Sequence, residues 1–340
     1  MRLYHLIFLL GLLAPLNAAD AFFERLFRTS LDLPPSEQTE RARPIFERAQ
    51  EAQAAGNQRS ALRQYRRIWR RLPASDYTAE ATYNYATLRY ERREWIKAYD
   101  SYQRVLAYHP GFPHFNRIVH RQFDIALRVA EGENTRFLLI FPYRALNRAA
   151  GYFAGVVNNA PYHDLAPLAL MNMALIYQYQ GQTMEAIDAL DWMINEYPTS
   201  LLASDAYLTL AETFSELVDG PEYDQGATRE AMSYFEDFLI LYSEHEGVAQ
   251  AEEGLREMEE VFARSKLVIG QFYFRYRGWY DAAEVFFNET ITTAPDSEAA
   301  DTARDYLARI EERREQAEQA RSDGDRQQER NFLQRLLRRG

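Results

Sequence analysis

The sequence contains no cysteine among its 340 residues. This absence excludes disulfide bonds, thiolate metal sites, a cysteine nucleophile and a lipidated N-terminal cysteine. Glycine and proline are also scarce, at 15 and 13 residues, whereas tyrosine and phenylalanine number 23 and 20. Because few breakers and many large apolar side chains favour long helices over short strands, an all-α protein is predicted.

Recognisable catalytic and cofactor motifs are missing as well. The six histidines are scattered, and none pairs with another at a metal-binding spacing. Asp323-Gly324-Asp325 is like the start of a calcium loop but has no closing glutamate, so we interpret it as a turn. Neither a glycine-rich phosphate loop nor a nucleophile elbow is present. We therefore expect no enzyme, no cofactor and no metal, and the net charge of −11 argues against a nucleic-acid partner.

The N-terminus has the layout of a secretory signal. Arg2 precedes an apolar run from Leu6 to Leu13, and small residues follow it. An uncleaved anchor helix is the alternative, but the run is shorter than the roughly 20 residues that cross a bilayer. The signal predicts export, and because no second long apolar run exists, we expect a soluble protein of the cell envelope or a secreted one.

One pattern of side chains recurs six times along the chain. A small residue is followed by apolar residues four and seven positions later, and by proline twelve positions later. The copies are Ala61, Tyr65, Ile68 and Pro73; Ala98, Tyr102, Val105 and Pro110; Ala149, Phe153, Val156 and Pro161; Ala186, Leu190, Met193 and Pro198; Ala231, Phe235, Phe238 and Ser243; and Ala283, Phe287, Thr290 and Pro295. Because these offsets lie on one helical face and proline ends a helix, each copy is predicted to be the second helix of a pair.

A turn is predicted before each of these helices, five residues ahead of the small residue. Glycine occupies that position four times, where a tight turn needs a left-handed residue. The glycines are Gly56, Gly181, Gly226 and Gly278, with Arg93 and Arg144 in the other two copies.

This arrangement resembles the tetratricopeptide repeat (TPR), and its cleanest copy runs from Pro167 to Ser200. The resemblance implies a right-handed superhelical solenoid of about five to six TPR-like helix-turn-helix repeats. An ordinary helical bundle is the alternative, which six aligned copies disfavour. The spacing between copies varies from 37 to 52 residues, so inserts are expected.

The predicted organisation follows from the copies and their inserts. It is a signal peptide at 1–21, a linker at 22–37, repeats 1 and 2 at 38–113, an inserted region with repeats 3 and 4 at 114–200, C-terminal repeats at 201–321 and a basic amphipathic tail at 322–340. We expect 114–131 to be a helix and 247–277 to be one long helix shared by consecutive repeats. A break at 322–325 is expected to precede the tail, which either caps the solenoid or contacts a membrane surface or a partner.

A helical solenoid offers a concave surface lined by the first helix of each pair. Aromatic rings with polar neighbours there suit the binding of extended peptides. The candidate groove residues are Arg43, Phe46, Gln50, Glu80, Tyr83, Thr87 and Tyr90. Packing against the neighbouring repeat is an equally open interpretation for each of them.

The run Lys266 to Tyr273, continued by Arg277-Gly278-Trp279-Tyr280-Asp281-Ala282-Ala283, resembles the closing repeat of the BamD family of outer-membrane assembly factors. The resemblance implies a periplasmic location at the inner face of the outer membrane. It also implies two kinds of protein partner, the β-barrel insertase and unfolded outer-membrane proteins. Arg277, with Arg275 beside it, would contact the insertase.

Two functions are therefore expected in order of preference. The first is a non-catalytic, BamD-like scaffold for β-barrel assembly. The alternative is a general periplasmic TPR adaptor for cell-wall synthesis or polysaccharide export, which the missing lipidated cysteine motivates.

Overall fold

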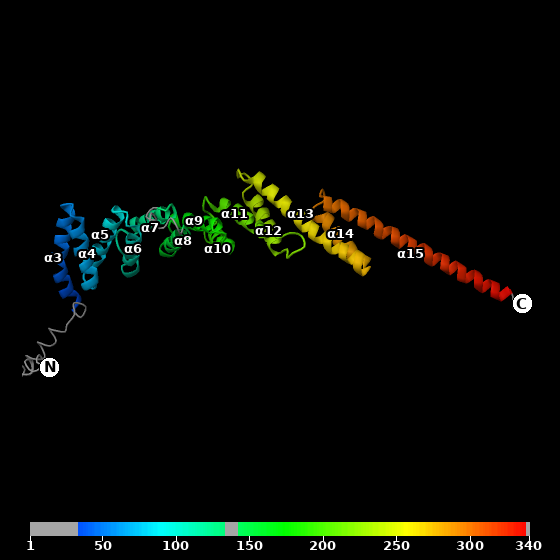
Figure 1. Ribbon diagram of the computed structural model, residues 1–340, viewed down its shortest axis with the longest axis horizontal. Helices are drawn as coiled ribbons and strands as arrows, with labels where there is room; N and C mark the ends of the chain where they lie inside the picture. The colour runs from blue at the N-terminus through cyan, green and yellow to red at the C-terminus, as the bar shows by residue number, and fades with distance from the viewer. Residues whose placement is uncertain (1–32, 133–141, 338–340) are drawn as a thin grey trace, which may run out of the picture. The chain divides into compact units, whose positions relative to one another are not determined.

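The computed structural model describes residues 33–132 and 142–337, and within these ranges all regular structure is helical (Figure 1). The predicted signal peptide and all but the last residues of the linker lie outside the described residues. The chain divides into two compact units, Met1–Ala169 and Leu170–Gly340, and the division falls within helix α9 (Leu165–Tyr179). The prediction of an all-α array of helix-turn-helix repeats is confirmed.

The first unit is a run of helices from α3 to α8, in which α3 to α7 each pack on the next helix in the sequence. Its helices are α3 (Pro35–Ala54), α4 (Gln58–Arg71), α5 (Thr78–Glu91), α6 (Trp95–Tyr108), α7 (Phe115–Ala130) and α8 (Pro142–Asn159). Helix α7 agrees with the helix predicted at 114–131. The residues that follow it, 133–141, lie outside the described residues.

The second unit continues in the same way, with α13 also packing on α11 and α15. Its elements are α10 (Thr183–Glu196), α11 (Ala203–Ser215), α12 (Gly226–Leu241), α13 (Val248–Phe272), the π-helical turn η1 (Tyr273–Arg277), α14 (Tyr280–Thr293) and α15 (Glu298–Leu337). The 25 residues of α13, extended by the five of η1, match the long helix predicted at 247–277. No described helix combines the length and the low polarity that crossing a membrane would require.

The repeating pattern of side chains forms the core. In all six copies the small residue and the residues four and seven positions after it are at most 2% exposed. Each of the six helices that carry them ends two residues before the proline or, in α12, the serine that takes its place. The spacing of four and seven therefore predicted both the buried face and the helix end.

The predicted turns hold at three of the four glycines. Gly56, Gly181 and Gly278 adopt positive φ angles of 72°, 69° and 65°. Arg93 takes the same left-handed conformation, at φ 57°, although a Cβ atom makes it unfavourable there. The turn geometry is therefore required by the helix pair rather than by glycine itself.

The turn predicted at Gly226 is wrong, because this glycine is the first residue of α12. The residue with positive φ in the preceding loop is Gly220, at 129°. The longer acidic insert moves the turn away from the usual offset. Arg144 lies inside α8, so that position is not a turn either.

The break predicted at 322–325 is also wrong, since α15 runs through it for 40 residues. A single glycine within a helix costs only about 1 kcal/mol, and the flanking Glu, Gln, Arg and Ala residues are strong helix formers. Asp323 also forms an ion pair with Arg326, three residues later, at 3.6 Å. The segment 322–337 is therefore a continuation of α15 rather than a separate tail.

Candidate protein-interaction surfaces

The groove residues predicted on α3 have different environments. Phe46 is 5% exposed, and its ring centroid lies 5.8 Å from that of Tyr65 and 5.1 Å from that of Tyr77. Arg43 and Gln50 are exposed on the same helix. Phe46 is thus a core residue, while Arg43 and Gln50 are accessible to a ligand.

On α5, Tyr83 is buried in the same manner. Its ring lies 6.1 Å from Tyr102, 5.2 Å from Phe112 and 5.0 Å from His114. Glu80, one turn earlier, is exposed. Tyr83 therefore contributes to packing between α5, α6 and the loop that follows α6.

The last two predicted groove residues, Thr87 and Tyr90, are half-buried and hydrogen-bonded. The Thr87 hydroxyl lies 3.1 Å from the Tyr102 hydroxyl, and the Tyr90 hydroxyl donates to Asp124 Oδ2 at 2.7 Å. Burial, together with this hydrogen bond, raises the pKa of Tyr90. Both hydroxyl groups join neighbouring helices, and peptide binding at these positions stays a prediction.

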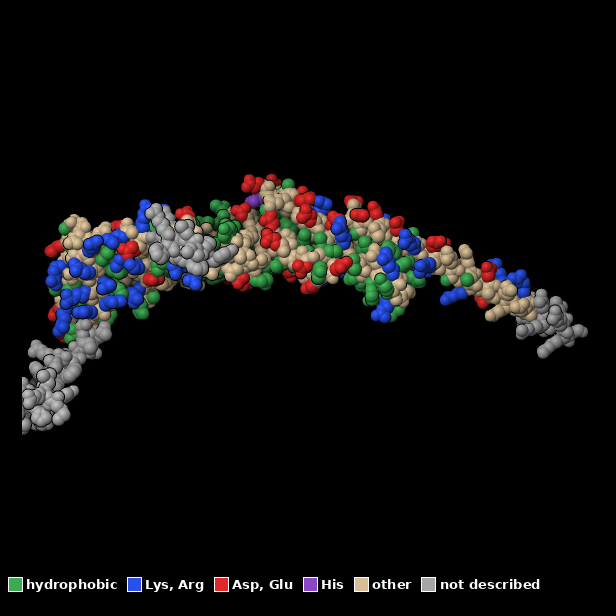
Figure 2. Space-filling model, viewed as in Figure 1, with side chains coloured by type: hydrophobic (Ala, Val, Ile, Leu, Met, Phe, Trp, Pro, Cys, Tyr) green, Lys and Arg blue, Asp and Glu red, His purple; other side chains and the backbone are tan. Residues whose placement is uncertain are grey.

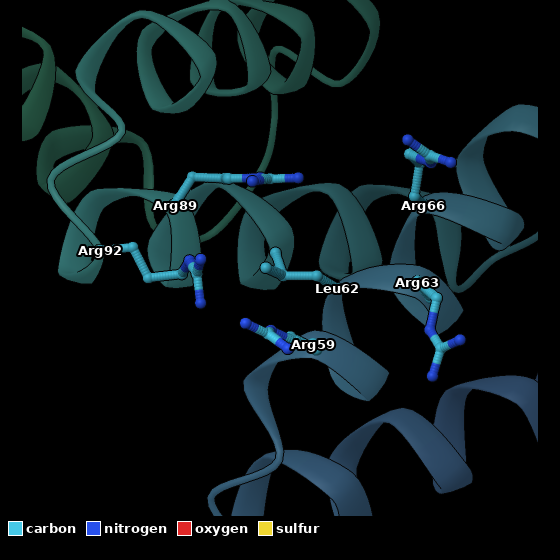
Figure 3. A pocket seen from close by; sticks show the side chains of 6 residues that line it. All are labelled: Arg59, Leu62, Arg63, Arg66, Arg89 and Arg92. Atoms are coloured by element: carbon cyan, nitrogen blue, oxygen red, sulfur yellow. The ribbon is translucent and has the colours of Figure 1, made fainter.

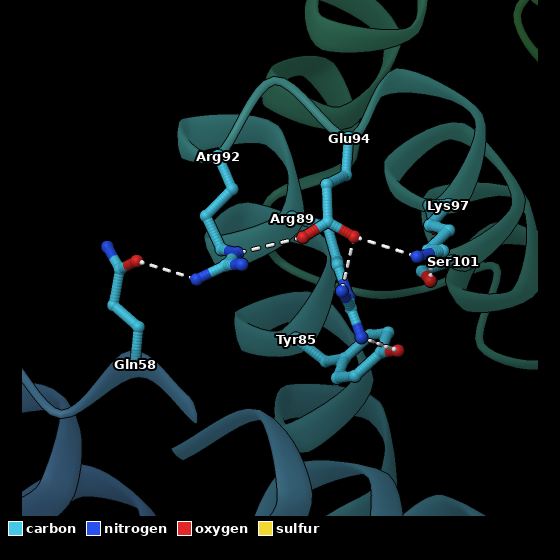
Figure 4. Close-up of polar contacts among 7 residues, drawn as sticks. All are labelled: Gln58, Tyr85, Arg89, Arg92, Glu94, Lys97 and Ser101. Atoms are coloured by element: carbon cyan, nitrogen blue, oxygen red, sulfur yellow. Dashed lines mark hydrogen bonds and ion pairs between the residues drawn. The ribbon is translucent and has the colours of Figure 1, made fainter. Parts of the chain in front are cut away.

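Glu94, between α5 and α6, is the centre of a cluster of cations in the first unit (Figure 4). Its carboxylate accepts hydrogen bonds from Arg92 at 2.8 Å, from Lys97 at 3.0 Å and from Arg89. Burial alone would raise the pKa of Glu94, but the hydrogen bonds from Arg92 and Lys97 and the charge of Arg89 lower it to about 2. The carboxylate thus stays ionised and joins the two helices.

Lowering the pH is expected to weaken this cluster. Because the folded-state pKa of Glu94 lies below its ordinary value of 4.5, the stabilisation is complete above pH 4.5 and is lost as the pH falls toward 2. The carboxylate is partly exposed, so solvent screening limits the loss to about 1 kcal/mol. Urea unfolding of wild type and Glu94→Gln at a series of pH values checks this. Parallel pH profiles for the two proteins would contradict the prediction.

An exposed aromatic surface surrounds η1 in the second unit. Phe272 is 44%, Tyr276 77% and Trp279 59% exposed. The guanidinium of Arg277 lies 5.7 Å from the centroid of the Phe272 ring and 5.8 Å from that of Trp279. We call Phe272, Tyr276, Arg277 and Trp279 the η1 surface. π-Helical turns are rare and frequently lie at functional sites.

The neighbouring predicted contact residue, Arg275, has a different role. Its guanidinium donates a hydrogen bond to the Tyr306 hydroxyl and lies 5.6 Å from the centroid of that ring. Arg275 therefore ties η1 to α15, whereas Arg277 lies among exposed rings. The sequence motif led to the two arginines but not to the aromatic surface, because periodicity does not distinguish an exposed ring from a packed one.

A second feature that the sequence analysis missed is a concentration of arginines in the first unit. Up to Ala169 the sequence has 23 Lys and Arg against 16 Asp and Glu, whereas from Leu170 onwards it has 16 against 34. The two units thus carry formal charges of +7 and −18. The blue side chains in Figure 2 gather over α3 to α5. The net charge of −11 concealed this difference.

Metal-binding geometry is absent from the part of the chain that the structure describes. No group of three or more His, Asp or Glu side chains there converges closely enough to hold an ion.

Comparison with known proteins identifies relatives of part of the chain. A family model described as YfiO, outer membrane lipoprotein, matches residues 146–326. The outer membrane protein assembly factor BamD of Caulobacter vibrioides is 25% identical over 129 residues, which make up 38% of this chain and 42% of that relative. The chain thus aligns with less than half of the length of this relative.

Two solved structures are similar at low sequence identity. MamA of Desulfovibrio magneticus is 16% identical, with a TM-score of 0.29 and coverage of 63% of this chain and 99% of that chain. A tetratricopeptide repeat protein of Parabacteroides merdae is 15% identical, with a TM-score of 0.29 and coverage of 78% and 98%. The family match covers more than half of the sequence and all of α9 to α14, so the chain belongs to the YfiO family of outer membrane lipoproteins.

Proposed function

We propose that this protein is a non-catalytic periplasmic scaffold in the assembly of outer-membrane β-barrel proteins. The observation that carries the proposal is the η1 surface, which lies within the residues matched by the family model. Exposed rings beside an arginine are typical of the energetically dominant centre of a protein interface. This surface would bind the β-barrel insertase.

The aromatic composition of the η1 surface favours a protein partner over a small ligand. Tyrosine, tryptophan and arginine are enriched where two proteins meet, because they combine large apolar area with polar groups. Tyr276 and Trp279 would bury area against the insertase, and Arg277 would supply a charged hydrogen-bond donor. Arg275 would hold η1 in place against α15 through its hydrogen bond to the Tyr306 hydroxyl, without contacting the insertase itself.

Unfolded barrel proteins would bind in the first unit. Of the predicted groove residues there, Arg43, Gln50 and Glu80 are exposed, and Thr87 and Tyr90 are half-buried. They offer hydrogen bonds and charges to an extended chain, while the buried rings of Phe46 and Tyr83 hold the helices that present them. The protein would work at the periplasmic face of the outer membrane, with a peripheral membrane contact through its N- or C-terminal segment.

The alternative is a general periplasmic TPR adaptor for cell-wall synthesis or polysaccharide export. The lack of cysteine favours it, because the matched family is described as lipoproteins, whereas this sequence has no thiol to acylate. Under this alternative, enzymes of those pathways would replace the insertase in affinity purification from the envelope.

The proposal is tested by the binding of the purified chain to the purified insertase of the same organism. We expect Arg277→Ala to raise the dissociation constant about tenfold, because a charged hydrogen-bond donor at the interface is lost. Arg256→Ala removes the same charge from an exposed position of α13 and should leave binding unchanged. No binding by wild type, or equal effects of the two substitutions, would refute this assignment.

A further inference from the structure

The first unit contains a cavity of about 520 Å³ whose walls are almost entirely arginine (Figure 3). Arg59, Arg63 and Arg66 reach it from α4, and Arg89 and Arg92 reach it from α5. The remaining lining residue is Leu62, and no carboxylate lines the cavity. We call this set the arginine pocket. It lies before residue 146, outside the match to the family model.

The guanidinium groups of the pocket fall into two classes. Arg89 and Arg92 share the single carboxylate of Glu94 as an ion-pair partner. Arg59, Arg63 and Arg66 are exposed and form no ion pair or hydrogen bond within the described residues. Gathering uncompensated cations in one cavity costs repulsion energy, which a bound anion removes.

The sequence of α4 concentrates this charge on one side. The helix has six arginines and no acidic residue. Arg59, Arg63 and Arg66 are spaced by four and three residues, so they lie on one face of the helix. They span seven positions, or about 10 Å at 1.5 Å per residue. The pocket thus presents a short row of forked donors rather than an extended basic surface.

From this geometry we propose that the arginine pocket binds a ligand that carries two phosphate groups. The planar guanidinium fork matches phosphate oxygens with paired hydrogen bonds. A ligand with two neighbouring phosphates carries at least two negative charges and is short enough for both to contact the three unpaired arginines. An isolated carboxylate supplies less charge in the same volume. The ligand is either a soluble diphosphate or the headgroup of a lipid with two phosphates.

The experiment uses the full chain and two probes. Inorganic pyrophosphate is titrated calorimetrically, and vesicles of phosphatidylcholine with and without cardiolipin are tested by co-flotation. The variant Arg63→Gln/Arg66→Gln removes two unpaired charges of the pocket. The matched control Arg67→Gln/Arg71→Gln removes the same charge from the same helix, at residues that line a different cavity. Circular dichroism checks that both variants stay folded.

We expect the pocket variant to weaken binding about tenfold or more, and the control to change it less than about threefold. Pocket-dependent binding of pyrophosphate supports a soluble ligand, and pocket-dependent flotation with cardiolipin supports a lipid headgroup. Equal losses in the two variants would indicate diffuse attraction and overturn the proposal. It is also overturned when neither phosphate probe binds.

Discussion

Replacing Phe287 with alanine is expected to lower the free energy of unfolding by about 3 to 5 kcal/mol. The ring is fully buried and stacks on Tyr306, with 5.0 Å between ring centroids. Helix α13 also approaches the ring closely at Gly270, where a Cβ atom would lie 2.7 Å from it. Removal of the ring leaves a cavity between three helices that rigid backbones cannot fill.

The matched control is Val285→Ala, two residues away on α14. Val285 is 55% exposed, so its truncation should cost less than about 0.5 kcal/mol. Urea unfolding followed by circular dichroism at equal protein concentration measures both variants. If Phe287→Ala were no more harmful than Val285→Ala, the interpretation of the repeating pattern as the core would be wrong for this repeat.

Gly254→Ala is expected to destabilise the second unit by about 2 kcal/mol, although alanine is the better helix former. A Cβ atom there would lie 2.4, 2.7 and 2.9 Å from three carbon atoms of the Phe235 ring. That ring is 2% exposed, so it cannot swing out into solvent without losing its packing. The clash forces α12 and α13 apart or turns the ring out of its favoured rotamer.

The same substitution at a second helical glycine, Gly324→Ala, is expected to have the opposite effect on stability. Gly324 lies within α15, and a Cβ atom there would meet nothing within 4 Å. The substitution should therefore raise helix stability by up to about 1 kcal/mol. Thermal unfolding of the two variants beside wild type measures the signs, and a loss at Gly324 equal to that at Gly254 would rule out packing as the cause.

The buried side of each second helix could be predicted from the sequence because its spacing has a direct geometric meaning. Residues such as Ala61, Tyr65 and Ile68 share one face of any α-helix, whatever surrounds it. The proline that follows ends the helix for covalent reasons. The turns were predictable only where the connection is short, as at Gly56, and not beside the long insert before Gly226.

The candidate sites were harder to predict, because a first helix has neighbours on two sides. The spacing put Phe46, Tyr83, Gln50 and Tyr90 together on the predicted groove face of their helices. It could not show which part of that face the adjacent repeat covers. The structure buries the first two and leaves the others accessible or half-buried. The arginine pocket was missed for another reason, since it joins residues 59–66 of α4 with Arg89 and Arg92 of α5.

The packing of helices on their sequence neighbours has a consequence for how this protein loses its structure. Most helix contacts in each unit link segments adjacent in sequence, so short loops close them and little chain entropy is lost. Stability then varies from repeat to repeat, as in other arrays with nearest-neighbour coupling. A lesion at Phe287 would open its own repeat first, while amide hydrogens around Tyr65 would keep their slow exchange with solvent.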